Sequence, residues 1–474
     1  MPNGPSRRSF IQLSSAALAA AGSISARAGA PLDSDGTSPE IQVRLTAGIK
    51  RYSTETSIRW EPAKATDSAV IEIKPAQRYQ DVLGFGAALT DSACYTLNRL
   101  APAARERMFR NLFHPPEMGL NTCRIAMGAS DYATKAYSYD EGEPDPELHR
   151  FSIDHDREYI LPILRLARQT NPSLFLLASP WSPPGWMKTG NSLFGGSMRK
   201  KYFASYANYF VKFLQAYADA GIPVDAVTSQ NEVDTDQDGR MPACLWGQEY
   251  EIEFVSQHLG PALARNNLST KIWILDHNYN LWGRALGELE DPGVRKYADG
   301  IAWHGYAGSA IAMTRVQEAY PDKHMYWTEG GPDYTEPGYG TDWVKWAVTF
   351  AEVLRNRSRC IIGWNFALDE KGRPNIGPFS CGGLVTIDSK TQEATYSGLY
   401  YALAHYSRAI RRGARRFETA GSADGVSHVG FLNPDNSSAL ILTNAGSDTR
   451  VQLALNGMAA DVSLPASSVT TLTW

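Results

Sequence analysis

The stretch of sequence that decides the fold is a strand-like run that closes on an acid, Ala226-Val227-Thr228-Ser229-Gln230-Asn231-Glu232. A second stretch has the same design, His324-Met325-Tyr326-Trp327-Thr328-Glu329. Each is rich in residues of high strand propensity and ends in a polar or aromatic setting. If both strands belong to one (β/α)8 barrel, their carboxyl ends meet at the same mouth, and Glu232 and Glu329 face each other there.

The region around these two stretches alternates between strand and helix patterns. Further strand candidates are Val82–Leu89, Thr122–Met127, Leu174–Ser179, Lys271–Leu275, Gly300–Tyr306 and Cys360–Leu368. Helical patterns lie between them, for example Asp156–Thr170, Tyr202–Ala220, Glu249–Asn266 and Asp342–Arg355. Eight strands alternating with helices predict an α/β fold, a (β/α)8 TIM barrel, over residues 76–408.

The alternative for this region is a doubly wound open sheet. Such a sheet usually carries a glycine-rich phosphate fingerprint, GxGxxG, after its first strand. The first strand here contains Gly84-Phe85-Gly86-Ala87-Ala88, which does not match that fingerprint. We interpret these glycines as positions where two barrel strands approach each other closely.

The sequence pattern at both ends of the chain differs from that of the middle. Period-two alternation, typical of half-exposed strands, occurs at 41–45, 57–60 and 69–73 and again at 427–432, 439–444, 451–455 and 469–474. The segment Asn433–Asn436 favours a hairpin turn. The ends are rich in strand patterns, whereas the middle alternates between strands and helices. This arrangement predicts an attached β-sandwich domain formed by both termini, from residues 40–75 and 409–474.

The first residues resemble a targeting segment and are left out of the fold. Ser6–Ile11 contains a twin-arginine motif, an apolar run follows to Ile24, and small residues near Ala28 suit cleavage. We predict a twin-arginine-type signal peptide over residues 1–30, and therefore a periplasmic or extracellular protein. The plainer alternative is a disordered basic tail. The apolar run is too short to span a bilayer as a mature helix, so we expect no stable membrane insertion.

Composition excludes several classes of function. A formal net charge of −4 offers no general attraction to nucleic acid or to anionic membranes. The five cysteines have no CxxC or metal-like spacing, so we expect neither a disulfide framework nor a zinc site. The 12 Trp and 23 Tyr suit carbohydrate binding, although core packing explains such numbers equally well. The sequence gives no indication of the oligomeric state.

Polar and aromatic residues follow six of the predicted strands, where a barrel keeps its chemistry. Taken singly, each has a plainer explanation. A glutamate after a strand is often held by a helix dipole, His304 suits a buried core position, and Trp181 suits packing against prolines. Together they indicate a binding site with two acids. Two carboxylates on either side of a sugar are the minimum equipment for cleaving a glycosidic bond, so we expect a retaining glycoside hydrolase.

Several strings, in this order, resemble glycoside hydrolase family 30 and most closely its glucosylceramidase branch. They are Gly84–Asp91, Ala178–Lys188, Ala226–Glu232, Gly300–Tyr306, Trp327–Glu329 and Gly363–Leu368. The resemblance extends from about residue 40 to the end and includes the sandwich.

The resemblance implies roles for individual residues. Glu232 is expected to be the general acid/base and Glu329 the nucleophile. The expected substrate-binding residues are Asp131, Trp181, Asn231, His304, Tyr306 and Trp364. No cofactor and no metal are implied. The nearby second carboxylate is expected to raise the pKa of Glu232 so that it carries a proton.

Some positions depart from the family pattern, among them Val233 after the first glutamate and Gly330 after the second. The loop Asp234–Arg240 is acidic and is expected to border the leaving-group site. We expect a carbohydrate or glycolipid substrate, a β-glucoside such as glucosylceramide or a short β-glucan. An endo-β-1,6-glucanase or a β-xylosidase is the alternative within the family. A non-catalytic carbohydrate-binding protein and a metal-dependent hydrolase are the alternatives outside it.

Overall fold

A closed ring of eight parallel strands occupies the centre of the chain in this computed structural model, which describes residues 40–474. The strands are β5 (Gly84–Ala87), β6 (Thr122–Ala126), β7 (Phe175–Ser179), β8 (Ala226–Thr228), β9 (Lys271–Asn278), β10 (Ala298–His304), β11 (His324–Glu329) and β12 (Ser358–Gly363). Most of their residues are buried, as in parallel sheets that are covered on both faces. The predicted (β/α)8 TIM barrel is confirmed. The predicted signal peptide at residues 1–30 lies outside the described residues.

Gly86 allows the barrel to close between β5 and β6. A Cβ atom on Gly86 would lie 1.8 Å from the backbone oxygen of Thr122, so a side chain has no room there. The two strands meet in a parallel bridge between Ala88 and Arg124, and the backbone N–H of Leu89 donates to the oxygen of Arg124 at 2.8 Å. The interpretation of this glycine as a position of close strand approach is confirmed.

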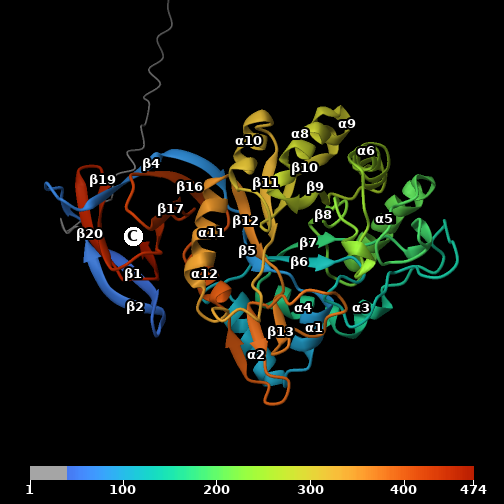
Figure 1. Ribbon diagram of the computed structural model, residues 1–474, viewed down its shortest axis with the longest axis horizontal. Coiled ribbons are helices and arrows are strands. Elements are labelled where there is room, and N and C mark those ends of the chain that lie inside the picture. The colour runs from blue at the N-terminus through green and yellow to red at the C-terminus, as the bar shows by residue number, and fades with distance from the viewer. Residues whose placement is uncertain (1–39) are drawn as a thin grey trace, which may run out of the picture.

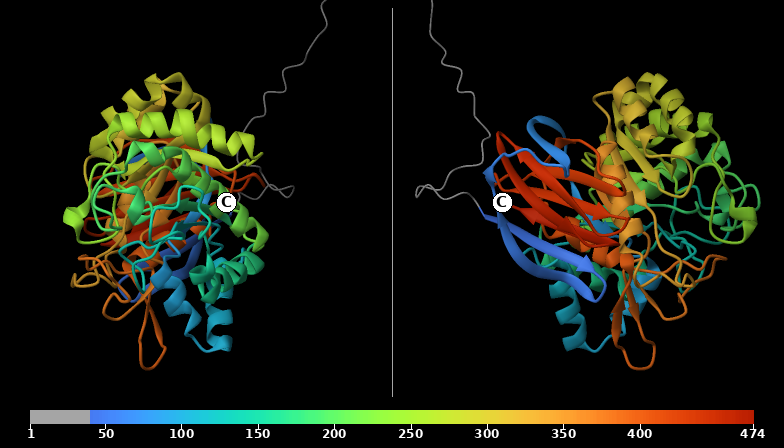
Figure 2. Two further views of the ribbon diagram at one scale, coloured as in Figure 1. Left: turned by 90° about the vertical axis from the view of Figure 1, so that its right-hand side faces the viewer. Right: turned by 60° about the vertical axis from the view of Figure 1, so that its left-hand side comes forward.

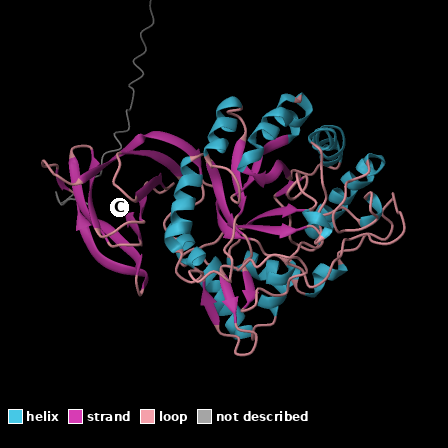
Figure 3. Cartoon of the chain, viewed as in Figure 1, coloured by secondary structure: helices cyan, strands magenta, loops and turns pink. Residues whose placement is uncertain are grey.

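Helices surround the ring and cover its outer face (Figure 1; Figure 3). They are α1 (Asp91–Asn98), α2 (Pro102–Phe113), α3 (Asp154–Glu158), α4 (Ile160–Thr170), α5 (Phe203–Asp219), α6 (Gln248–Glu253), α7 (Gly260–Arg265), α8 (Trp282–Glu290), α9 (Pro292–Tyr297), α10 (Ile311–Ala319), α11 (Trp343–Arg355) and α12 (Gly398–Ser407). Each longer helix buries the apolar residues of one face. In α5, Tyr206, Phe210 and Phe213 are fully buried, as their helical spacing predicts.

A ten-stranded antiparallel-rich sheet, folded on itself, forms the second domain. Its strands are β1 (Glu40–Ala47), β2 (Lys50–Arg59), β3 (Glu61–Pro62), β4 (Ala69–Asp81), β16 (Arg415–Ala420), β17 (Val426–Leu432), β18 (Ser438–Asn444), β19 (Thr449–Leu455), β20 (Met458–Leu464) and β21 (Ser468–Thr473). The first and last of them pair antiparallel, with Gln42 opposite Thr473. Figure 2 shows the blue N-terminal strands beside the red C-terminal ones. The prediction of a β-sandwich formed by both termini is confirmed.

Helices α11 and α12 lie between the sandwich and the barrel (Figure 1). His405 of α12 is completely buried and contacts Thr46 of β1 and Thr471 of β21, both at 2.8 Å. Burial lowers the pKa of His405 to about 3, so the ring is neutral and serves as a structural hydrogen-bonding group. One side chain therefore ties both ends of the chain to the barrel.

Several strand ends differ from the sequence-based expectation, and two of these differences bear on the site. β12 ends at Gly363, not at Leu368, because Asn365 adopts a left-handed backbone with φ 57° and turns the chain away. The residues beyond it start a separate three-stranded sheet of β13 (Ala367–Asp369), β14 (Val385–Ile387) and β15 (Ala394–Tyr396). Likewise β8 ends at Thr228, so Glu232 lies on the loop after the strand.

Two further observations concern the described residues alone. Each of the five cysteines is a free thiol. Between residues 40 and 474, no helix has both the length and the apolar character needed to cross a membrane.

Candidate active site

A cavity of about 950 Å³ opens at the carboxyl ends of the barrel strands. The side chains that line it come from loops and strand ends all around the ring. They are Asp131, Trp181, Asn231, Glu232, Thr235, Gln237, Met241, His277, Asn278, Tyr306, Glu329, Trp364, Phe379 and Cys381. Seven of the eight residues singled out in the sequence are among them. The eighth, His304, is completely buried directly beneath.

Glu329 is the last residue of β11 and is 5% exposed. Its carboxylate is held from two sides. The hydroxyl of Tyr306 donates to Oε1 at 3.1 Å, and the guanidinium of Arg124 donates to Oε2. Charged and hydroxyl donors of this kind hold a carboxylate in one orientation, as a reacting group requires.

Glu232 reaches the cavity from the loop after β8, where its backbone is left-handed with φ 53°. Its own N–H donates to the backbone oxygen of Asp276 at 3.0 Å, which fixes the bend. The side-chain amide of Gln237 donates to Oε2 at 2.7 Å. Non-glycine residues rarely adopt this conformation, and such strain collects at functional sites.

His304 lies between the two glutamates. Its Nδ1 is 3.4 Å from Oε1 of Glu232, and its Nε2 is 3.8 Å from Oε2 of Glu329. The structure thus brings the two acids, which are remote in sequence, to opposite nitrogens of one imidazole ring. Nε2 also contacts Oδ1 of Asp276 at 3.0 Å, which orients the ring.

Arg124 and Asp276 form a buried hub under the cavity, and both side chains are completely inaccessible to solvent. They pair at 2.6 Å, and Arg124 also donates to Oδ1 of Asn231 at 2.6 Å and to Oγ of Ser179 at 3.0 Å. A buried charge of this kind is tolerated only when it is paired and hydrogen-bonded.

Asp276 has four further polar contacts. The hydroxyls of Ser179, Thr228 and Thr328 donate to it at 2.7 to 2.9 Å. Burial raises the pKa of this carboxyl, but the charge of Arg124, the contacts with His304 and the hydroxyl donors outweigh burial and hold the pKa far below its usual range. Asp276 is therefore a permanent anion that anchors Arg124 and His304.

The pKa values of the two glutamates are shifted in opposite directions. Burial raises the pKa of Glu232, but His304, the charge of His277 and the hydrogen bond from Gln237 outweigh burial and place the pKa below its ordinary value. This is opposite to the expectation from sequence, which considered the neighbouring carboxylate and overlooked the imidazoles and the amide. Burial raises the pKa of Glu329 above its ordinary value, although the charges of His304 and Arg124 oppose that shift.

The remaining predicted residues form the floor and walls of the cavity. The rings of Trp181 and Trp364 stack with centroids 5.2 Å apart, and Arg124 lies 4.7 Å from the centroid of Trp181. Asp131 is 3% exposed, and its Oδ1 has no hydrogen-bond partner among the described residues. Burial, followed by the charges of Glu329 and Glu232, raises the pKa of Asp131 well above its usual value. A buried acid with a free oxygen, next to indole rings, suits contact with a polar ligand.

One group of side chains in the cavity has metal-ligand chemistry. Ligand-type atoms of Glu232, His277 and His304 lie within 4.8 Å of one another. Burial lowers the pKa of His304, but the charges of Glu329, Asp276 and Glu232 outweigh burial and raise the pKa to about 9. A protonated imidazole has no lone pair for a metal ion, so these side chains fit the sharing of protons better than they fit a metal ion.

Four side chains that contact the two glutamates, or the groups that hold them, were not singled out from the sequence: Arg124, Gln237, Asp276 and His277. Arg124 had a usable signal, because it is the one charged residue in the apolar strand β6, and such a residue is buried only with a partner. Asp276 follows four apolar residues of β9, but the strand was expected to end before it. Gln237 lies in a loop, where no periodicity marks a position.

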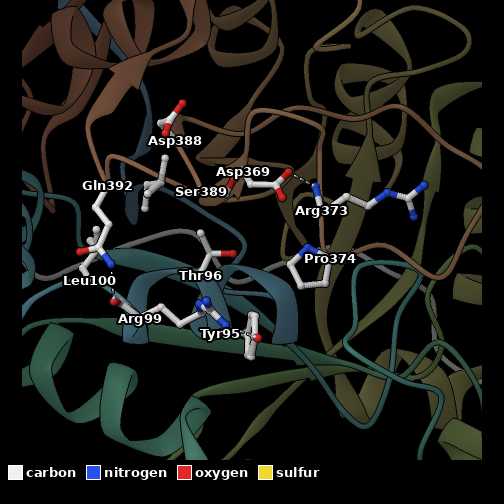
Figure 4. Close-up of a pocket in the computed structure, with 11 residues that line it drawn as sticks. Tyr95, Thr96, Arg99, Leu100, Asp369, Arg373, Pro374, Asp388, Ser389 and Gln392 are labelled. Carbon is white, nitrogen blue, oxygen red and sulfur yellow. Dashed lines mark hydrogen bonds between the residues drawn. The ribbon is translucent and has the colours of Figure 1, made fainter.

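A second cavity, of about 710 Å³, lies at the end of α1 and shares no residue with the first (Figure 4). Two of its polar side chains, Asp369 and Gln392, are already bound to neighbouring backbone groups. Oδ1 of Asp369 accepts from the backbone N–H groups of Lys371 and Arg373, both at 2.8 Å. Gln392 accepts from Ala101 and donates to the backbone oxygen of Arg99, both at 3.2 Å. The glutamate cavity is therefore the better candidate site.

Comparison with known proteins agrees with this geometry. Residues 82–410 match the glycosyl hydrolase family 30 TIM-barrel domain, and residues 413–472 match the glycosyl hydrolase family 30 beta sandwich domain. An endo-1,6-beta-D-glucanase of Neurospora crassa is 31% identical over 80% of this chain and 82% of its own length. A putative glucosylceramidase 3 of Caenorhabditis elegans is 30% identical over 90% of this chain and 86% of its own length.

Among solved structures, an endo-beta1,6-glucanase superposes with a TM-score of 0.83 at 28% identity, and the match covers 92% of this chain and 99% of that one. Similarity therefore extends through the barrel and the sandwich. A match of this extent makes the chain a glycoside hydrolase of family 30.

Proposed function

We propose that this enzyme is a retaining β-glycosidase that hydrolyses β-glucosides through a covalent glycosyl-enzyme, with Glu329 as nucleophile and Glu232 as general acid/base. One observation carries the proposal. Both carboxylates lie in one cavity at the barrel mouth and contact the same imidazole ring, at 3.4 Å and 3.8 Å. Two acids on either side of one small space are the equipment of retaining hydrolysis.

In the first step, an oxygen of Glu329 attacks the anomeric carbon of the sugar. The bond from that carbon to the leaving oxygen breaks, and Glu232 gives its proton to that oxygen. In the second step, Glu232 takes a proton from water, the resulting hydroxide attacks the same carbon, and Glu329 leaves as a carboxylate. The anomeric configuration is therefore retained, and Glu232 ends the cycle protonated again.

The charged groups around the two glutamates form one coupled set. Arg124 and protonated His304 supply two positive charges against the carboxylates of Asp276, Glu232 and Glu329. One further proton makes the group neutral, and the acids and the imidazole share it as a coupled set. Nη1 of Arg124 and the hydroxyl of Tyr306 donate to Glu329 and stabilise its ionised form, although burial leaves its pKa above the ordinary value.

We assign the glycone, the sugar that becomes attached to the enzyme, to the floor of the cavity. Asp131 and Trp181 would hold its hydroxyls, Asn231 would contact the 2-hydroxyl, and Trp364 would line the pocket. The free oxygen of Asp131 and the stacked indole rings support this assignment. Asn231 is itself fixed by Arg124, which keeps its amide N–H groups available to a sugar.

The leaving group is either a ceramide-like lipid or a further sugar. Relatives of both kinds are similarly close, a putative glucosylceramidase at 30% identity and an endo-1,6-beta-D-glucanase at 31%. The rim favours a sugar on one side, because Thr235, Gln237 and Asn278 present hydrogen-bonding groups. Met241 and Phe379 form its apolar side, and Phe379 is 41% exposed. An endo-β-1,6-glucanase is therefore our second candidate.

A panel of substrates tests the proposal. We expect the purified enzyme to hydrolyse 4-nitrophenyl β-D-glucoside in preference to the β-xyloside and β-galactoside, with the β-anomer of glucose as first product by NMR. Pustulan and glucosylceramide, compared side by side, identify the leaving group, and oligosaccharides from pustulan would indicate an endo enzyme. An α-anomer as first product, or no hydrolysis of any β-glucoside, would contradict the proposal.

We also propose export, on the basis of the twin-arginine motif at Arg7 and Arg8. Changing both arginines to lysine is expected to leave the enzyme in the cytoplasm of a bacterial host that has the twin-arginine pathway, because that pathway reads the arginine pair. Cell fractionation followed by an activity assay measures the result. Equal activity outside the cytoplasm for both proteins would overturn this proposal.

A further inference from the structure

The loop 233–241 brings a neutral amide to one oxygen of Glu232. The side-chain N–H of Gln237 donates to Oε2 at 2.7 Å. The other oxygen, Oε1, faces His304 at 3.4 Å and His277 at 3.9 Å. Gln237 is thus the one side-chain contact to this carboxylate, within residues 40–474, that comes from the loop 233–241 and not from a barrel strand.

The backbone of this loop is held in an uncommon conformation. Gln237, Asp238 and Gly239 are consecutive left-handed residues, with φ of 53°, 52° and 66°. The hydroxyl of Thr235 accepts from the N–H of Gln237 at 3.0 Å, and Oδ1 of Asp236 accepts from the N–H of Asp238 at 3.2 Å. Left-handed non-glycine residues persist only where the surroundings hold them, and they collect at functional sites.

The contact favours one protonation state of Glu232. An N–H donor stabilises an ionised carboxylate, which is the form that activates water in the second step. In the first step the same carboxyl must carry a proton for the leaving oxygen. An amide can serve both states, because rotation by half a turn presents its oxygen, which accepts from a protonated carboxyl.

We propose that Gln237 is a positioning residue whose contact with Glu232 depends on the protonation state of Glu232. Gln237 donates to the carboxylate when Glu232 acts as base, and it withdraws or rotates when Glu232 acts as acid. Because Gln237 stands on the rim, the leaving group that enters beside it sets when this exchange happens. The inference rests on the proposed roles of Glu232 and Glu329. It adds a residue that controls the proton of Glu232, on the loop 233–241 at the leaving-group side of the site.

Other charged groups also face Glu232 and stay unchanged in the test. They are His277 from β9, His304 from β10, Glu329 from β11 and Asp131 from a loop. Behind them, Asp276 contacts His304, Arg124 contacts Glu329, and the charge of Asp234 acts on His277. Their combined effect sets the starting pKa of the acid. The variants below change the amide alone, so a difference in pH profile reports on Gln237.

The experiment measures the pH dependence of kcat/KM for the wild type and for the variants Gln237→Ala, Gln237→Asn and Gln237→Glu. The substrate is 4-nitrophenyl β-D-glucoside, or pustulan if the wild type hydrolyses only the polymer. The alkaline limb reports the loss of the proton from the acid. Loss of the N–H donor destabilises the ionised form, so the limb is expected to move to higher pH by about one unit in the alanine and asparagine variants. A carboxylate at position 237 repels the ionised acid, so the limb moves further in Gln237→Glu.

Two features keep the result interpretable. Asparagine tolerates the left-handed backbone, so Gln237→Asn removes the contact without adding backbone strain. Asp238→Asn, in the same loop, changes an exposed side chain that does not line the cavity and is expected to leave the profile unchanged. An alkaline limb that stays in place in all three Gln237 variants, or moves to lower pH, overturns the inference. Failure of the wild type on every β-glucoside would instead overturn the proposed function itself.

Discussion

Replacing Glu329 by glutamine is expected to abolish turnover, with a loss of kcat on the order of 10⁴- to 10⁶-fold on 4-nitrophenyl β-D-glucoside. Glutamine has nearly the same shape, but its neutral amide does not attack an anomeric carbon. The variant should fold, because Arg124 can still donate to the amide oxygen and the hydroxyl of Tyr306 can accept from the amide N–H. Steady-state kinetics and a urea unfolding curve measure the two properties separately.

The other glutamate provides the matched control. Glu232→Gln keeps the nucleophile, so it is expected to lose about 10²- to 10⁴-fold on substrates that need protonation of the leaving group. With an activated aryl β-glucoside it should still form the glycosyl-enzyme, and azide, which needs no general base, should restore turnover as a β-glucosyl azide. A cyclitol epoxide should label Glu329 in the wild type, as seen by mass spectrometry of the peptide. A Glu329→Gln enzyme that keeps more than a few per cent of activity would remove Glu329 as nucleophile.

Replacing Arg124 by methionine is expected to have the largest effect on stability. The guanidinium is completely buried and is paired with Asp276 and Glu329. Removing one partner of a buried ion pair leaves the other charge uncompensated, at a cost of about 3–5 kcal/mol in the free energy of unfolding. Urea unfolding of the wild type and the variant measures this difference.

Activity should respond as well, with a defined sign. Arg124 lowers the pKa of Glu329, so its loss lets that pKa rise. The nucleophile must be ionised, and the acidic limb of kcat/KM is therefore expected to move to higher pH. Arg124→Lys keeps the positive charge but lacks the branched guanidinium. Its free energy of unfolding should therefore be higher than that of the methionine variant.

Arg359 offers a control on the same barrel. It lies at the start of β12, pairs with the half-exposed Asp81 and is remote from the mouth where β12 ends. Arg359→Met should lose less stability, because a partly exposed pair contributes little, and its acidic limb should not move. Equal effects of the two methionine variants on the acidic limb would contradict the role given to Arg124.

The general architecture was predictable from sequence because the local patterns and the fold agree. Period-two runs at both ends and alternating strands and helices between them leave few other arrangements. The role of Gly86 could also be predicted, because a glycine within a strand often marks a close approach of two backbones. The backbone oxygen of Thr122 occupies the space that a side chain at position 86 would need. The residues at the strand tips were predictable because all parallel strands end at one mouth.

The contacts beneath the mouth were less predictable. Arg124 points from the middle of a strand to groups on three other strands and loops, and such a convergence depends on the register of the closed barrel. The direction of the pKa shift at Glu232 depends on His277, His304 and Gln237 together, and these become neighbours only in space. The position of Glu232 also depends on a left-handed turn, for which its own sequence carries no glycine.

The pairing of β1 with β21 has a consequence for the timing of synthesis. The ribosome makes β1 long before β21, so β1 and β2 lack this partner strand until β21 has been made. A lone hairpin is marginally stable in water, and its open edge invites pairing with other chains. Nascent and prematurely terminated copies of this enzyme therefore present an unpaired edge, and chaperones have the longest window to act there.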